Sequence, residues 1–208
     1  MAYRPTQKTE AHKAALRERV LAAALSIVSA AGFNALTMNA VAQQAGIATG
    51  AVYRHFESKA QLCAEVFRIA TEKEVAVVRE TALREGDPAR RLLDVIETFA
   101  LRALRARRLA YALIAEPVDA LVDRERLRYR LAYAQIFQQL VDDGIASGGF
   151  PAQGAALSAA ALVGVIAESL VGPLSLQAET GPSVEQASLV RSIQAFCLRA
   201  VALKNLDD

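Results

Sequence analysis

The stretch from Thr37 to Phe56, TMNAVAQQAGIATGAVYRHF, constrains the fold of this chain more than any other. Val41, Ala42 and Ala45 recur at the i, i+1, i+4 spacing that makes one apolar stripe on a helix. The Thr37 hydroxyl can accept a hydrogen bond from an amide of the first turn, and Gly46 suits a helix end that needs a positive φ. The stretch therefore predicts two short helices joined by a tight turn, a helix-turn-helix.

The second helix of this unit is predicted to present one side to DNA. Ile47, Val52 and Phe56 can pack back on the apolar stripe of the first helix. The other side chains are then divided between partly buried and outward directions, and the outward ones suit phosphates and base edges. They are Thr49, Ala51, Tyr53, Arg54 and His55.

The same stretch resembles the DNA-binding domain of the tetracycline-repressor (TetR) family of bacterial transcription regulators. The family pattern runs from a glycine and LT through AG to G-x-x-Y-x-x-F-x-x-K, and this chain matches it at Gly46, Gly50, Tyr53, Phe56 and Lys59. The resemblance covers residues 13 to 66 and is only architectural beyond them. One departure is Ala48, where the family commonly has a serine or threonine that caps the second helix. Thr49 is expected to take that role, which competes with base contact.

The resemblance implies DNA contacts residue by residue. Tyr53 and Lys59 resemble phosphate contacts, whereas Thr49, Gly50 and Arg54 lie where the family approaches bases. Arg54 is expected to read sequence, because a guanidinium can bond O6 and N7 of guanine together. The complete set of expected DNA-binding residues is Thr37, Thr49, Gly50, Tyr53, Arg54, His55 and Lys59.

The charge distribution supports this interpretation. The net charge is only +2, yet residues 1 to 60 contain seven Lys or Arg against three Glu, while the rest contains 17 against 19 Asp or Glu. A basic excess beside a helix-turn-helix favours phosphate binding. The polar residues 1 to 13, with Arg4, Lys8 and Lys13, are interpreted either as a phosphate-contacting arm or as an ordinary mobile terminus.

Composition limits the remaining possibilities. With 53% hydrophobic residues and six prolines, a chain of 208 residues can bury a substantial core. Cys63 and Cys197 are far apart and outside any C-x-x-C spacing, so they are interpreted as two buried thiols and not as a zinc site or disulfide. No signal peptide is evident, and the apolar run 159–167 is shorter than the roughly 20 residues of a membrane span. A cytoplasmic location is expected.

The rest of the chain is predicted to be helical. We expect an all-α fold, with an N-terminal three-helix helix-turn-helix domain (residues 1–57) and a C-terminal helical domain for ligand binding and dimerisation (residues 58–208). The first helix is predicted at residues 14–31, and Ser58 with Gln61 forms a capping box that opens a connecting helix over residues 58–83. Later helices are predicted at residues 88–103, 108–116, 119–147, 155–171 and 183–203.

An aromatic stripe marks a candidate ligand site. Tyr129, Tyr133 and Phe137 recur at i+4 spacing, either as core or as the lining of a cavity. With Phe99 and Tyr111 they are the expected ligand-binding residues, and an apolar lining with a few phenol hydroxyls favours a small hydrophobic or aromatic effector. The cavity should touch the connecting helix. Arg102, Glu116 and Arg126 are candidates for adding charge, but each is expected to be solvated.

The last two helices have little polar surface. Residues 155–171 are nearly all small or aliphatic, with Gly164 among them. In the family the last two helices of each subunit form a four-helix dimer interface, and small residues suit close helix approach. The alternative is a core within one chain.

No enzyme signature is present. The two histidines, His12 and His55, have no Ser or Cys partner at a recognised nucleophile spacing, and no phosphate-binding or metalloprotease motif occurs. We therefore expect no catalytic residues, metal ligands or cofactor. The interpretation is a homodimeric transcription regulator, a repressor by the usual mode of the family, that binds a palindromic operator and is released by its effector. The alternative is a helical ligand-binding or adaptor protein that does not bind DNA.

Overall fold

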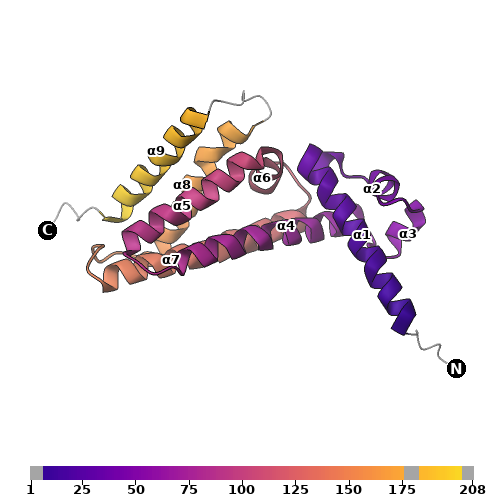
Figure 1. Ribbon diagram of the computed structural model, residues 1–208, viewed down its shortest axis with the longest axis horizontal. Coiled ribbons are helices and arrows are strands. Elements are labelled where there is room, and N and C mark those ends of the chain that lie inside the picture. Colours follow the sequence, from indigo (N-terminus) through magenta and orange to yellow (C-terminus); the bar gives the residue numbers. More distant parts are fainter. Residues whose placement is uncertain (1–6, 176–182, 203–208) are drawn as a thin grey trace.

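The computed structural model of the protein describes residues 7–175 and 183–202, and within this part every regular element is helical. The expected all-α fold is confirmed. In Figure 1 helices α1 to α3 lie at one end of an elongated molecule, and α4 runs from them along the larger helical body. The elements are α1 (Gln7–Ala31), η1 (Phe33–Ala35), α2 (Met38–Ala45), α3 (Thr49–Tyr53), α4 (Lys59–Ala82), α5 (Pro88–Arg105), α6 (Arg107–Ile114), α7 (Ala120–Ala146), α8 (Ala155–Leu174) and α9 (Ser183–Ala202).

The start of α1 differs from the prediction. The helix begins at Gln7 and not at residue 14, because the polar residues before the apolar stripe are mostly good helix formers and no proline lies between residues 7 and 31. Lys13 of the predicted arm is therefore an exposed helical residue. Arg4 and the side chain of Lys8 lie outside the described part.

Local chemistry explains how α2 begins and ends. The Thr37 hydroxyl accepts a hydrogen bond from the Ala40 amide at 3.1 Å, and Gly46 ends the helix in the left-handed conformation with φ 63°. Both predictions are confirmed. The predicted cap by Thr49 is wrong, because Ala48 is the N-cap of α3 and makes no side-chain bond. Thr49 is the first helical residue, and its hydroxyl donates to Oδ1 of Asn39 on α2 at 3.0 Å.

Helix α4 takes the place predicted for the connecting helix. Its N-cap Ser58 accepts from the Gln61 amide at 3.1 Å, while the Gln61 side chain accepts from the Glu57 amide at 2.7 Å. The helix has 24 residues, which corresponds to about 36 Å. It packs against α1 at one end and against α5 and α7 along its length. One continuous core of buried apolar side chains extends through both parts of the molecule.

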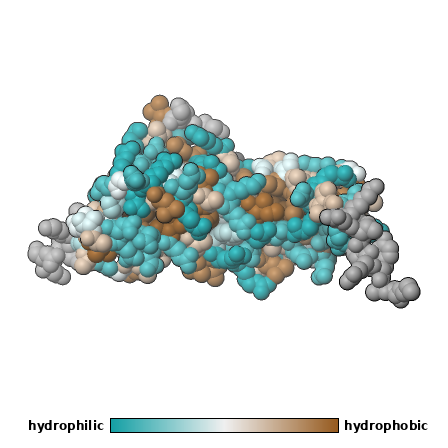
Figure 2. Space-filling model, turned by 60° about the horizontal axis from the view of Figure 1, so that its bottom comes forward, coloured by the Kyte–Doolittle hydropathy of each residue, from teal (hydrophilic) through white to brown (hydrophobic). Residues whose placement is uncertain are grey.

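Helix α8 is more apolar than the run 159–167 indicated. Its 20 residues are enough to cross a membrane by length and composition alone. The helix packs against α5, α6, α7 and α9, with Leu162, Ile166 and Leu170 buried. On the face shown in Figure 2, hydrophobic residues form separate patches in a mainly hydrophilic surface.

The two cysteines match their predicted role. Cys63 and Cys197 are both buried and free of disulfide bonds. Burial raises the pKa of each thiol to about 11, so both are protonated at neutral pH. Within the described residues no group of three or more His, Cys, Asp or Glu is placed to hold a metal ion.

Candidate DNA-binding surface and ligand cavity

The outward side of α3 carries a concentrated set of accessible polar side chains. Val52 and Phe56 are almost completely buried against the N-terminal helices, which fixes the orientation of α3. The neighbouring Tyr53 is 51% exposed, and Arg54 is also exposed. An exposed phenol beside an exposed guanidinium provides one hydrogen-bonding tip and one fork of donors for a phosphate or a base edge.

The predicted DNA-binding residues differ in exposure. Thr49 and His55 are partly buried, and the Thr49 hydroxyl is engaged with Asn39. At Gly50 no atom beyond the neighbouring residues and the backbone of α3 lies within 4 Å of the position that a β-carbon would take, so the backbone there is open to approach. The exposed members of the set are Thr37, Gly50, Tyr53, Arg54 and Lys59.

Basic residues of α1 lie close to this surface. The pKa of His55 is lowered by burial first, and then by the positive charges of Lys13 and Arg17. The Arg17 guanidinium lies 5.2 Å from the centre of the Phe56 ring. The end of α3 therefore has a positive electrostatic environment, which suits the phosphate backbone.

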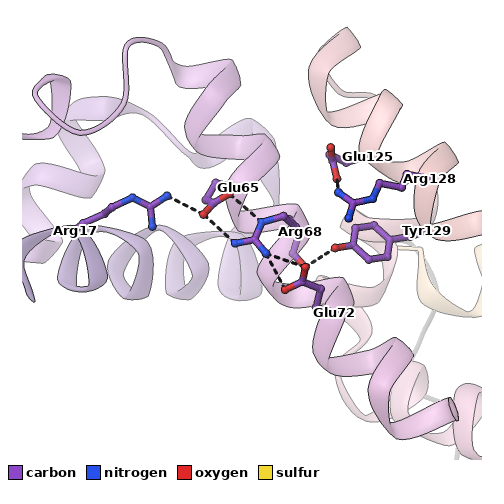
Figure 3. Close-up of polar contacts among 7 residues, drawn as sticks. All are labelled: Arg17, Glu65, Arg68, Glu72, Glu125, Arg128 and Tyr129. Carbon is purple, nitrogen blue, oxygen red and sulfur yellow. Dashed lines mark hydrogen bonds and ion pairs between the residues drawn. The ribbon is translucent and has the colours of Figure 1, made fainter. Parts of the chain in front are cut away.

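An ionic chain runs from α1 across α4 to α7 (Figure 3). Arg17 bonds Glu65 at 2.7 Å, and Glu65 also bonds Arg68 at 3.0 Å. Arg68 pairs with Glu72 at 2.7 Å, and the Tyr129 hydroxyl lies beside Glu72 (Figure 3) and donates to the backbone oxygen of Arg68 at 3.3 Å. Hydrogen bonds from Arg68 and Arg17 lower the pKa of Glu65 to about 2, although burial opposes the shift. The chain connects the N-terminal domain to a residue that lines the cavity.

A cavity of about 100 Å³ lies between α4, α5, α6, α7 and α8. Four of the five expected ligand-binding residues line it: Phe99, Tyr129, Tyr133 and Phe137. Phe99 and Tyr133 meet edge to face, with ring centres 5.2 Å apart. Tyr111 is not among the lining residues, because α6 faces the cavity with Leu109, Ala110, Leu113 and Ile114, and Tyr111 lies off that face of the helix.

Three of the four charged residues at the cavity, Glu74, Arg102 and Arg126, are already paired. Two nitrogens of Arg102 bond the Glu74 carboxylate at 2.6 and 2.9 Å. Arg126 donates to the backbone oxygens of Leu113 and Glu116 at 3.0 and 2.7 Å, so it caps the end of α6. The expectation of solvated side chains was therefore wrong for Arg126, whose side chain is only 14% exposed.

Glu116 faces the N-terminal domain and is not a cavity residue. It is 5% exposed, and its two carboxylate oxygens accept from the amides of Phe33 and Asn34 at 3.0 and 2.9 Å. Arg108 of α6 donates to the Ala31 oxygen at the end of α1. The segment at the end of α6 therefore holds the turn between α1 and α2 by hydrogen bonds that involve charged groups.

Sequence reasoning missed the residues that α4 contributes to the cavity. Phe67, Thr71, Glu74 and Val78 all line it, at the helical spacing of one face. That periodicity was available in the sequence. Nothing in the sequence, however, indicated that Glu116 would bond amides more than 80 residues away, because this contact depends on tertiary structure.

Known proteins resemble this chain in sequence and fold. The family of bacterial regulatory proteins named tetR matches residues 20–66. The chain is 27% identical to the HTH-type transcriptional repressor KstR2 of Rhodococcus jostii over 142 residues, 66% of this chain and 69% of the relative. It is 40% identical to the repressor KstR of Mycolicibacterium smegmatis over 76 residues, 36% of this chain and 37% of the relative.

A solved structure resembles the whole fold. The transcriptional regulator FadR of Bacillus subtilis, crystallised with stearoyl-CoA, superposes with a TM-score of 0.73 and 18% identity. The match covers 88% of this chain and 98% of FadR. At this identity the likeness concerns the fold alone.

Proposed function

Because this chain belongs to the TetR family of bacterial regulatory proteins, we propose that it represses transcription by binding a palindromic operator as a homodimer and leaves it when a small apolar effector binds. It is a DNA-binding regulator with a ligand-binding domain, and not an enzyme. The operator, the dimer, the effector class and a cytoplasmic location are parts of the proposal.

The observation that carries the DNA-binding role is the orientation of α3. Its apolar residues are buried, and Tyr53 and Arg54 extend from the molecule beside the positive charges of α1. Two such helices related by a dimer axis enter successive major grooves. The half-sites are then about one helical turn, 34 Å, or somewhat more apart.

The outward faces of α8 and α9 support the dimer. Leu157 is 77% exposed, and Ala160, Ala161 and Gly164 are exposed with it on α8. On α9 Phe196 is 53% exposed. An apolar face of small residues with large ones at its edges suits close packing against the same two helices of a second copy.

The position of the cavity supports regulation by a ligand. An effector shifts the equilibrium between DNA-binding and released conformations only if it binds one of them better. The cavity borders α4, the helix that leads from the N-terminal domain. Its aromatic lining and the stearoyl-CoA bound by FadR both favour an effector with a large apolar part.

A binding titration with matched arginine variants tests the proposal. Arg54 and Arg84 are both exposed, but Arg84 follows the far end of α4. DNA from the promoter beside the gene of this protein should bind the wild-type protein and Arg84→Ala alike in fluorescence anisotropy. Arg54→Ala should lose about 1–3 kcal/mol of discrimination between the operator and a sequence with the contacted guanine replaced. Equal affinity and base preference for both variants would contradict the role of Arg54, and no binding by the wild type would favour the adaptor alternative.

A further inference from the structure

One polar atom at the cavity has no partner. Thr71 of α4 is 5% exposed, and its hydroxyl oxygen is fully buried without a hydrogen bond. Thr81 on the same helix shows the usual solution, since its hydroxyl donates to the Val77 oxygen four residues earlier at 3.0 Å. An unpaired buried hydroxyl is unfavourable, so Thr71 retains an unmet capacity to donate and to accept.

Thr71 is one of the residues that line a cavity that is otherwise mostly apolar. Phe67 and Glu74 flank Thr71 on the same face of α4, and Phe99 and Tyr133 lie among the other lining residues. Burial raises the pKa of the Tyr133 phenol, with Glu74 adding to the effect, so this hydroxyl stays neutral at physiological pH. The cavity therefore offers neutral hydroxyl groups within an aromatic lining.

The buried wall has no charge left to bind an ionic group. Arg102 is neutralised by Glu74 through two hydrogen bonds. Arg126 is used by the backbone at the end of α6 and by Asp123 at 3.2 Å. Arg130 also borders the cavity but is an exposed residue. Bringing a carboxylate into this wall would remove it from water without a free cation to compensate.

We propose that the cavity binds a neutral, mainly apolar molecule with a hydroxyl or carbonyl oxygen, and that Thr71 Oγ1 hydrogen-bonds that oxygen. This inference rests on the proposed function, in which the cavity is the effector site. Thr71 is then the residue that distinguishes an oxygenated ligand from the corresponding hydrocarbon. A site that provides a hydrogen-bonding group discriminates in this way because the hydrocarbon leaves that group unpaired.

Three related compounds separate the chemical alternatives. The probes are 2-naphthol, naphthalene and 2-naphthoate, titrated into the full-length protein and followed by fluorescence or calorimetry. The substitution Thr71→Val removes the hydroxyl and keeps the branched shape. Thr81→Val is the matched control, because Thr81 is equally buried on α4 but does not line the cavity.

The wild-type protein and Thr81→Val should bind 2-naphthol about 5- to 10-fold more tightly than naphthalene, the ratio expected for one net hydrogen bond. In Thr71→Val this ratio should fall to about 1 through weaker binding of 2-naphthol, because naphthalene makes no bond to lose. In all three proteins 2-naphthoate should bind more weakly than 2-naphthol.

Other outcomes would overturn the inference. A preference for 2-naphthol that persists in Thr71→Val, or that falls equally in Thr81→Val, would remove the role of Thr71. Tightest binding of 2-naphthoate would show that the site takes anions. If none of the three probes bound to the wild-type protein, the cavity would not be a site for neutral, mainly apolar molecules of this kind. Operator binding by the wild type, measured separately, shows whether the regulatory function itself stands.

Discussion

The substitution Glu116→Gln tests whether one carboxylate joins the two domains. Glu116 is buried, and its two oxygens accept from the Phe33 and Asn34 amides. Glutamine has the same shape but offers one oxygen and one NH2 group. One of the two backbone N–H groups therefore keeps an acceptor, although a neutral one. The other backbone N–H group faces the NH2 group of the glutamine, which is itself a donor.

The expected loss of stability follows from these two bonds. Replacing a charged acceptor by a neutral one costs about 1 kcal/mol, and leaving the second buried amide unpaired costs about 1–3 kcal/mol. The free energy of unfolding should fall by about 2–4 kcal/mol. A smaller loss would mean that water or a shifted backbone satisfies the orphaned amide.

Urea unfolding followed by circular dichroism measures the change at a fixed protein concentration, because the proposed dimerisation would make stability depend on concentration. Glu80→Gln is the control, since Glu80 is an exposed carboxylate on α4. Its midpoint should match the wild type, and that of Glu116→Gln should be lower. Coincident midpoints for the two variants would refute the claim that the Glu116 carboxylate stabilises the domain contact.

Three further predictions concern assembly, pH and salt. Gly164→Arg should shift the protein from dimer to monomer in sedimentation. A side chain at this position has space in a single chain but would face the partner in the proposed interface. An intact dimer would place Gly164 outside the interface. The pKa of Glu65 falls from 4.5 to about 2 on folding, so the stability that its ion pairs add is present above pH 4.5 and is lost towards pH 2. The difference in melting temperature between wild type and Glu65→Gln should shrink over that range, and a constant difference would contradict the ion-pair account. Lys59→Ala should weaken operator binding similarly for all sequences and reduce the slope of log affinity against log salt by about 1, whereas an unchanged slope would exclude a phosphate contact.

Local chemistry made much of the N-terminal domain predictable. The cap at Thr37 and the left-handed Gly46 depend on neighbouring residues only, so the sequence was sufficient to place them. Thr49 was wrongly assigned as a cap. Its hydroxyl instead bonds Asn39, and this contact can be predicted only when α2 and α3 are already placed together. The start of α1 was missed because polar residues with high helix propensity continue a helix without an apolar stripe.

The cavity between α4 and α8 was predictable only in part. The periodicity of Tyr129, Tyr133 and Phe137 identified one face of α7, and these residues line the cavity. Tyr111 was selected for its residue type, yet the rotation of α6 about its axis decides which side chains face inward. Thr71 has no distinguishing sequence feature, because its significance comes from a missing hydrogen bond that only the folded structure reveals.

A hydroxyl-radical footprint of the promoter beside the gene of this protein tests the central claim most directly. The expected result is two protected half-sites of inverted sequence, centred about one helical turn or somewhat more apart, on the same side of the duplex. Protection should disappear with Arg54→Ala at protein concentrations where Arg84→Ala still protects both half-sites. A single unsymmetrical footprint of the wild-type protein would contradict a symmetric dimer that reads DNA through α3. The absence of any footprint at the highest protein concentration tested would contradict it as well.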